Sequence, residues 1–473
     1  MTDYIRSCVI IQTRFTWPSI YTFAKSTPFR MENSSGKNLQ PMAITFSQAL
    51  FWGIVFTLCT YGVFFIYSTG YIADEYPVRP NWWRQLIWLG FSAVVGFTVA
   101  ATNPRGLAWR TFVWCGYGTS LVLLVLTLLF GRTIGGARRW LAIGPLLLQP
   151  AEFAKFFTLM LLCQTIVWQA NGWRARIAKL IGLTIMLGLP LGLIISAPSF
   201  GNAFSIIPSI ICIFGIRYFN KKIWAVLVFL GVVSLLFSWH AVLELRKTSE
   251  ASNAKAATVQ DTSQSNNSPQ PQHSKAKDLL THLLHNYHSK RLEDYLTPKG
   301  GWNERQSIMT LASGGQFGKG YLQGTMKSLG YLPRTVAPTD FIFSVIGEEF
   351  GFFFGCLPVL LLYLLLFSIG FHWAGRTGDE QACLRSVGVL MMLAVHVCIN
   401  VGMTVRLIPI IGLPLPLLSY GGSFTMMTFL CLGVLHATST LPPADSEAAT
   451  SSDARDNEWS LGRLLRIRVQ SKR

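Results

Sequence analysis

Apolar runs separated by short polar segments alternate along most of this chain. Runs of about 17 to 25 residues recur, and that length crosses the hydrocarbon core of a bilayer as an α-helix. The pattern predicts an all-α polytopic membrane protein with about ten transmembrane helices. The expected helices cover residues 47–70, 82–102, 108–131, 150–169, 175–197, 201–218, 222–243, 341–369, 383–405 and 414–438.

The distribution of Lys and Arg between the runs indicates the orientation. With a cytoplasmic N-terminus, the inner segments carry about 21 basic residues and the short outer segments about six, which the positive-inside rule favours. We predict cytoplasmic segments at 1–46 and 441–473. The first is either an extension or upstream codons misread as coding, with Met31 as the true start. The second is a solvated tail or ends in a short amphipathic helix on anionic lipid.

One connection is far longer than the others. After seven helices over 47–243, residues 244–340 form an extracytoplasmic loop, and three helices follow over 341–440. Long extramembrane loops usually serve a function. Residues 248–277 are rich in Ser, Asn, Gln, Ala and Pro, which predicts a disordered insert. The aromatic and glycine-rich remainder, from Leu279 onward, is expected to fold against the outer membrane face.

Composition supports the membrane assignment. Of the 473 residues, 51% are hydrophobic and only 13% are charged, against roughly a quarter in soluble domains. A water-soluble globular enzyme is therefore excluded. The formal net charge of +18 lies mostly in inner segments and tails, so we expect contact with anionic membrane lipid and no nucleic acid.

Charged residues near the start of the fourth helix are the first candidates for chemistry. Arg138 and Arg139 lie on the outer side against the positive-inside bias, and guanidinium groups suit bidentate binding of phosphate oxygens. Glu152 and Lys155 follow on one helical face at a spacing that allows them to pair. A substrate-binding role and a structural ion pair both fit this cluster.

A second cluster lies where the long loop enters the eighth helix. Asp340 is a candidate general base at the membrane interface, and equally a candidate helix N-cap. Glu348 and Glu349 lie about two turns further along the same helix. A carboxylate at membrane depth is costly without a cationic partner, so we expect one of four basic side chains to pair with them. The candidates are Arg138, Arg139, Lys155 and Arg406.

Two further patterns are candidates for a binding site, and the first is the stronger candidate. The run from Pro414 to Ser423, which includes Ser419 and Tyr420, combines two prolines with Gly-Gly and predicts a broken helix entry of the kind that lines substrate cavities. His282, His285 and His288 have a spacing that could hold a transition metal, but their polar surroundings favour a solvated segment.

Taken in order, these strings closely resemble the SEDS family of bacterial cell-wall proteins, which includes RodA, FtsW and SpoVE. The resemblance covers about 47–243 and 279–440, and the glycine-rich string around Lys319 and the string 407–414 favour the RodA-like elongation branch. The strings that carry it are Arg139-Trp140, Gln149-Pro150 with Glu152 and Lys155, Gln306-Ser307 with Ser313-Gly314-Gly315, Thr339 to Phe343 with Glu348-Glu349, and Pro414 to Ser423.

The resemblance implies a peptidoglycan glycosyltransferase of the hexosyltransferase type. Its substrate would be lipid II, the undecaprenyl-pyrophosphate-linked disaccharide-pentapeptide, and Asp340 matches the family's catalytic carboxylate. The remaining candidates would bind substrate, with Mg²⁺ or Mn²⁺ as a candidate cofactor. The implied setting is the bacterial inner membrane, with a class B penicillin-binding transpeptidase and the elongation or division machinery as partners. The substrate-binding candidates are Arg138, Arg139, Glu152, Lys155, Lys319, Glu348, Glu349, Ser419 and Tyr420.

The chain departs from the family pattern at three positions. Pro338 replaces the usual His before Thr-Asp, Ser199 replaces an acidic residue, and Ala151 replaces Ser. These departures put the donor site in doubt without touching Asp340. The departures at Pro338 and Ser199 leave open a catalytically inactive scaffold that recruits the transpeptidase. A lipid II flippase is a separate alternative, and it would need a polar path through the helices.

Overall fold

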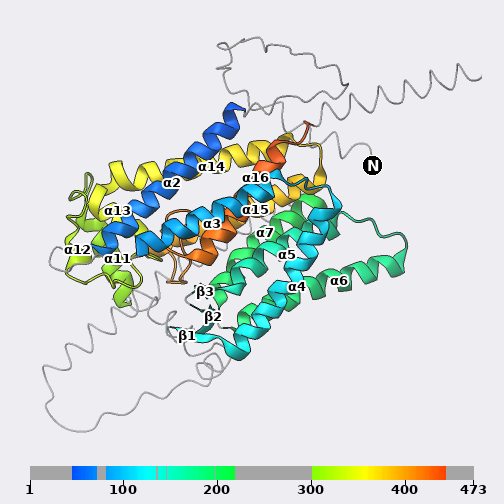
Figure 1. The fold of residues 1–473 in the computed structure, drawn as a ribbon, viewed down its shortest axis with the longest axis horizontal. Helices are drawn as coiled ribbons and strands as arrows, with labels where there is room; N and C mark the ends of the chain where they lie inside the picture. Colours follow the sequence, from blue (N-terminus) through cyan, green and yellow to red (C-terminus); the bar gives the residue numbers. More distant parts are fainter. Residues whose placement is uncertain are drawn as a thin grey trace, which may run out of the picture. The chain divides into compact units, whose positions relative to one another are not determined.

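Helices account for most of the chain that the computed structural model describes, which is residues 45–71, 81–134, 137–144, 146–197, 199–218 and 301–443. Figure 1 shows the long helices side by side. Five other predicted features lie outside the described residues: most of 1–46, the span 222–243, the insert 248–277, the histidines at 282–288 and the tail beyond 443. The long helices are α2 (Phe46–Gly70), α3 (Asn81–Ala101), α4 (Leu107–Phe130), α5 (Pro150–Ile166), α6 (Trp173–Ser196), α7 (Phe200–Tyr218), α13 (Ile342–Gly351), α14 (Leu357–Arg376), α15 (Glu380–Thr404) and α16 (Gly422–Ser439).

Eight of the candidate spans in the described ranges are long and apolar enough to cross a membrane, with α13 and α14 counted as one. The prediction of a multi-pass helical membrane protein is confirmed. The helix α5 has 17 residues and carries Glu152 and Lys155. It is almost wholly buried among its neighbours, so its environment is protein and not lipid.

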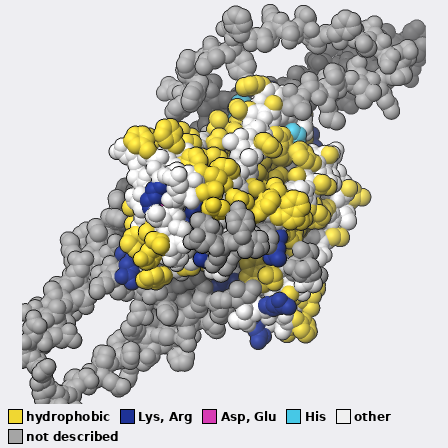
Figure 2. Space-filling model, turned by 60° about the vertical axis from the view of Figure 1, so that its left-hand side comes forward, with side chains coloured by type: hydrophobic (Ala, Val, Ile, Leu, Met, Phe, Trp, Pro, Cys, Tyr) yellow, Lys and Arg dark blue, Asp and Glu magenta, His cyan; other side chains and the backbone are white. Residues whose placement is uncertain are grey.

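The helices differ sharply in how much protein surrounds them. The apolar windows of α16 and α15 are 78% and 67% buried, whereas those of α3 and α6 are only 22% buried. The first two therefore form the centre of the bundle, and the other two present apolar side chains outward. Figure 2 shows hydrophobic side chains spread over the face that it presents. Such a surface is stable in lipid, because the hydrocarbon tails are as apolar as the side chains.

A small antiparallel sheet connects α4 to α5. The strands β1 (Arg132–Ile134), β2 (Ala137–Ile143) and β3 (Leu146–Leu148) lie in the order β1-β2-β3. Arg132 is opposite Trp140, and Leu141 is opposite Leu148. This sheet was not among the predicted elements, because β1 and β3 have only three residues each and cannot show an alternating pattern.

Two predicted spans are interrupted. The span 341–369 divides into α13, a π-helical turn η2 (Phe352–Cys356) and α14, and the break falls at Gly351, whose φ is 70°. The span 414–438 is helical only from Gly422. Pro414 and Pro416 lack the amide N–H that a helix interior needs, so the chain before Gly422 follows an irregular path.

Glycines hold the loop that precedes α13 tightly against that helix. In addition to α11 (Trp302–Ser313) and α12 (Thr325–Ser328), the loop contains a glycine-rich segment at 314–320. The amides of Lys319 and Gly320 donate to the carbonyls of Glu348 and Glu349, at 3.0 and 2.9 Å. A Cβ on Gly318 would lie 2.2 Å from the Glu349 carbonyl oxygen. Only glycine allows the two backbones to approach this closely.

We expect Gly318→Ala to destabilise the protein more than Gly315→Ala. Both glycines have positive φ, so each alanine meets backbone strain of about 1–3 kcal/mol. At Gly318 the new Cβ also collides with backbone atoms. At Gly315 a Cβ would meet no neighbouring atom within 4 Å. Thermal unfolding in detergent measures both variants. Equal losses of stability would show that the close approach to α13 is not required.

Candidate functional site

Asp340 lies in a loop whose backbone is fixed by two neighbouring elements. The Asn400 side-chain amide, from α15, donates to the Asp340 carbonyl at 3.0 Å and to the Leu413 carbonyl at 2.8 Å. The Ser419 hydroxyl donates to the Thr339 carbonyl at 2.5 Å and accepts from the Leu415 amide at 2.8 Å. We call residues 413–421 the proline-rich segment. It and α15 together set the position of the Asp340 backbone.

The same contacts decide what Ser419 and Tyr420 do. The Tyr420 amide donates to the Pro338 carbonyl at 2.8 Å, so three consecutive carbonyls, from Pro338 to Asp340, are each held by a donor. The Ser419 side chain is buried, and its hydroxyl is hydrogen-bonded to backbone groups. Its predicted role in binding substrate stays a prediction, and its observed role is to position the Asp340 loop.

The interpretation of Asp340 as a helix N-cap is wrong. The N-cap of α13 is Phe341, whose own side chain makes no capping hydrogen bond. Asp340 precedes the cap and is partly exposed, with its amide donating to the Val336 carbonyl at 3.0 Å. Asp340 therefore lies outside the helix, and its role as a general base stays a prediction.

The arginine candidates lie on β2 of the hairpin sheet. Arg138 is exposed and Arg139 is half-buried. The sheet leads into Gln149, whose amide donates to the Ser423 hydroxyl of α16 at 3.0 Å. Because α16 follows directly on the proline-rich segment, the hairpin and the Asp340 loop lie at the same end of the bundle.

A charged cluster is buried between three helices. The Lys155 ammonium lies 2.9 Å from the Glu152 carboxylate, so the ion pair predicted from their spacing is present. The ammonium also lies 3.0 Å from Asn202 Oδ1, 3.1 Å from His396 Nε2 and 3.4 Å from Ser205 Oγ. These partners come from α5, α7 and α15, and all are at least 95% buried. A substrate role for Glu152 and Lys155 stays a prediction.

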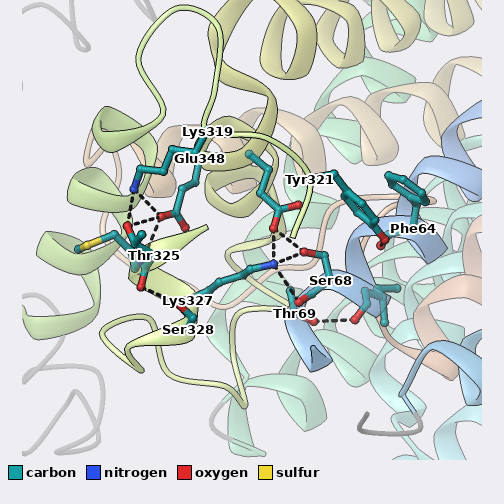
Figure 3. Close-up of polar contacts among 12 residues, drawn as sticks. Phe64, Ser68, Thr69, Lys319, Tyr321, Thr325, Lys327, Ser328 and Glu348 are labelled. Atoms are coloured by element: carbon teal, nitrogen blue, oxygen red, sulfur yellow. Dashed lines mark hydrogen bonds and ion pairs between the residues drawn. The ribbon is translucent and has the colours of Figure 1, made fainter. Parts of the chain in front are cut away.

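The predicted partners of Glu348 and Glu349 are wrong. Figure 3 shows Lys319 reaching Glu348 and Thr325, and Lys327 reaching toward Ser68. The Lys319 ammonium lies 2.8 Å from the Glu348 carboxylate, and Lys327 pairs with Glu349. The lysines come from the loop that packs on α13, and sequence spacing alone could not show that this loop reaches these carboxylates.

The two lysines tie the loop that precedes α13 to the transmembrane helices. Lys327, on α12, also donates to the Ser68 carbonyl at the end of α2. Burial lowers the pKa of Lys327, and the Glu349 carboxylate opposes that shift by favouring the ammonium. The Glu348 carboxylate accepts from the Met326 amide at 2.8 Å as well. Both glutamates therefore act as anchors for α12.

Arg406, the last expected partner of those glutamates, pairs with Glu304 of α11 at 3.3 Å. Its φ of 59° is unusual for a residue with a side chain. The pair connects α11 to the end of α15, just before the proline-rich segment.

Metal ligands are sparse in this site. Across the part of the chain that the structure describes, no group of three or more His, Cys, Asp or Glu side chains could hold a metal ion. A resident cation bound by protein ligands alone does not fit these residues. A cation shared with phosphate oxygens needs only one or two carboxylates and is compatible with Asp340.

Comparison with known proteins identifies the family. The chain matches the model of the FtsW/RodA/SpoVE family, described as cell cycle proteins, over residues 48–265 and 274–441. The chain belongs to this family.

Members of the FtsW/RodA/SpoVE family resemble the chain over most of its length. It is 30% identical to the peptidoglycan glycosyltransferase RodA of Treponema pallidum (strain Nichols), over 80% of this chain and 94% of that relative. It is 26% identical to the peptidoglycan glycosyltransferase MrdB of Escherichia coli (strain K12), over 76% and 85% of the two chains.

Solved structures share the fold. A chain in a peptidoglycan synthase complex, which coordinates polymerization and crosslinking, is 25% identical with a TM-score of 0.56, over 82% of this chain and 97% of that one. The rod shape determining protein RodA of Thermus thermophilus is 23% identical with a TM-score of 0.51, over 84% and 97%. The helical fold of the FtsW/RodA/SpoVE family is therefore present here.

Four polar residues near the candidate site were not predicted from the sequence. His396, Asn400 and Asn202 lie inside apolar runs, and Lys327 lies in the loop. The first two are four residues apart on α15 and face the Lys155 cluster and the Asp340 loop respectively. The signal was available, because a polar side chain within a membrane span is a functional candidate by default.

Proposed function

We propose that this protein is a peptidoglycan glycosyltransferase that polymerises lipid II into glycan strands during cell-wall elongation. Family membership supports the proposal, since relatives that match most of the chain are named peptidoglycan glycosyltransferases. The observation that carries it is the partly exposed Asp340, on a backbone held by Asn400, Ser419 and Tyr420. Fixed orientation of a carboxylate is what general-base catalysis requires.

In the proposed reaction, Asp340 accepts the proton of the 4-hydroxyl of an acceptor N-acetylglucosamine. That oxygen bonds to the anomeric carbon of the donor N-acetylmuramic acid as the bond from that carbon to the pyrophosphate oxygen breaks. Undecaprenyl pyrophosphate leaves with the electron pair. Negative charge grows on the leaving group, and Arg138 and Arg139 are the guanidinium groups at the same end of the bundle that can stabilise it.

We also propose a divalent cation cofactor, Mg²⁺ or Mn²⁺, which Asp340 would help to hold when substrate is present. The absence of a three-ligand group among the described residues supports a shared cation over a resident one. When bound, such a cation would neutralise charge on the leaving group. Chelation should then lower activity, and added Mg²⁺ or Mn²⁺ should restore it.

The proposed setting is the bacterial inner membrane, with both termini in the cytoplasm and Asp340 on the outer side. A class B penicillin-binding transpeptidase is the proposed partner, within the elongation machinery. The similarity to a chain from a complex that coordinates polymerization and crosslinking supports a crosslinking partner.

The direct test supplies labelled lipid II to purified protein with its transpeptidase and a divalent cation. We expect glycan strands from the wild-type protein. The flippase alternative predicts no strands and instead transfer of lipid II between leaflets of proteoliposomes. The scaffold alternative predicts neither activity. Absence of strands under conditions where the protein is folded and bound to its partner would reject the proposal.

A further inference from the structure

The hydrogen bonds around His396 determine where its ring proton lies. His396 is fully buried, and its Nδ1 lies 2.7 Å from the Met392 carbonyl oxygen. A carbonyl can only accept, so Nδ1 carries the proton. Nε2 lies 3.1 Å from the Lys155 ammonium, which can only donate. Nε2 is therefore the unprotonated nitrogen of a neutral ring, since an imidazolium would turn an N–H toward the ammonium.

The three protons of Lys155 then have three acceptors. These are Asn202 at 3.0 Å, His396 at 3.1 Å and the Ser205 hydroxyl at 3.4 Å. The Glu152 carboxylate, 2.9 Å away, forms an ion pair with the ammonium. The Asn202 orientation agrees, because its amide nitrogen donates to Ser199 and leaves its oxygen for Lys155. An ammonium with all three protons used inside the protein has none left for a substrate.

Glu152 has fewer polar contacts than Lys155. One of its oxygens faces Lys155, and the structure shows no other hydrogen bond or ion pair to this carboxylate from the described residues. Glu152 lies in the first turn of α5, directly after the sheet that carries Arg138 and Arg139. Lys155 holds this carboxylate in place, and His396 holds Lys155.

We propose that His396, as the neutral Nδ1–H tautomer, is a positioning residue for the polymerisation reaction and acts through Lys155 on Glu152. This inference rests on the proposed function and adds to it a residue that contacts no substrate. Without an acceptor at position 396, the buried ammonium has one proton unpaired, and it shifts toward its remaining partners. Glu152 then loses its fixed orientation.

The test compares three variants in the lipid II polymerisation assay. His396→Leu removes the acceptor, and we expect kcat to fall by about 10- to 100-fold with KM for lipid II changed less than about twofold. His396→Gln supplies an amide oxygen that can accept from Lys155, and it should recover most of the activity. Thr158→Val is the control. Thr158 is equally buried on α5, one turn beyond Lys155, and its hydroxyl makes no hydrogen bond to any described residue.

Two outcomes of the assay would overturn the proposal. Wild-type kcat in His396→Leu would show that the acceptor is not needed. Equal loss in His396→Gln and His396→Leu, with both folded, would show that the ring shape matters and not the hydrogen bond. Loss of activity in Thr158→Val as well would mean that any change in the cluster disrupts packing, which also rejects a specific role for His396.

A second measurement does not depend on activity. Nitrogen NMR of the wild-type protein labelled with ¹⁵N-histidine distinguishes the two neutral tautomers and the imidazolium, and the His396→Gln spectrum identifies the signals of His396. A protonated Nδ1 and bare Nε2 support the proposal. The opposite tautomer, or an imidazolium, rejects it. If the wild-type protein makes no strands, the proposed function fails while this spectrum still decides the hydrogen-bond assignment.

Discussion

Asp340→Asn should reduce lipid II polymerisation by at least about 100-fold, because a general base typically contributes 10²- to 10⁴-fold to the rate. The amide has nearly the same size as the carboxylate, and the contacts that fix the loop are made to backbone atoms of residues 338–340. The loop should therefore keep its conformation while losing the proton acceptor. The measurement is the initial rate of strand formation from labelled lipid II, beside thermal unfolding of the same preparation.

Glu380→Gln is the control for this experiment. Glu380 is half-exposed, pairs with Arg217 at 3.3 Å and lies at the opposite end of the bundle. Its loss should leave the rate unchanged. Wild-type rates in Asp340→Asn would remove this carboxylate from the mechanism and favour a function that needs no base, such as lipid transfer.

Among the charged residues that hold the loop before α13 in place, Glu349→Gln should be the most destabilising single change. It leaves the Lys327 ammonium, only 4% exposed, without its counter-ion. Removing one partner of a buried pair costs about 3–5 kcal/mol, because the remaining charge stays buried. The free energy of unfolding, measured by denaturant titration in micelles, should fall by about that amount.

The double variant Lys327→Met with Glu349→Leu removes both charges of the pair. It therefore separates the loss of the ion-pair attraction from the cost of leaving one buried charge unpaired. Replacing both charges by apolar groups is often close to neutral, so we expect stability to return to within about 1–2 kcal/mol of wild type. Glu380→Gln, which breaks a half-exposed pair, should cost less than about 1 kcal/mol. A double variant as unstable as Glu349→Gln would show that packing at α12, and not charge pairing, anchors the loop.

Much of the fold could be predicted from the sequence because membrane spans are local features. The apolar runs that gave α2, α3, α4, α6 and α7 have the length that a bilayer demands, and their ends agree with the structure to within about two residues. The Glu152 and Lys155 pair was also predictable, since a spacing of three on a helix places both side chains on one face. The family resemblance rested on the order of rare strings, which sequence alone contains.

The breaks in the helices were only partly predictable. Pro414 and Pro416 signalled an irregular entry, but the start of α16 at Gly422 depends on where the proline-rich segment meets the Asp340 loop. The break at Gly351 depends on the approach of Gly318, which lies 33 residues earlier in the sequence.

The partners of the buried charges were decided by the tertiary structure alone. The sequence shows that Glu348 and Glu349 need cations, because an unpaired carboxylate in a membrane protein's interior is costly. It does not show that Lys319 and Lys327 supply them, or that His396 reaches Lys155 from another helix. Hydrophobic length is a property of one segment, whereas pairing depends on which distant segments pack together. The sequence by itself therefore determined the membrane helices, and packing decided how the site is held.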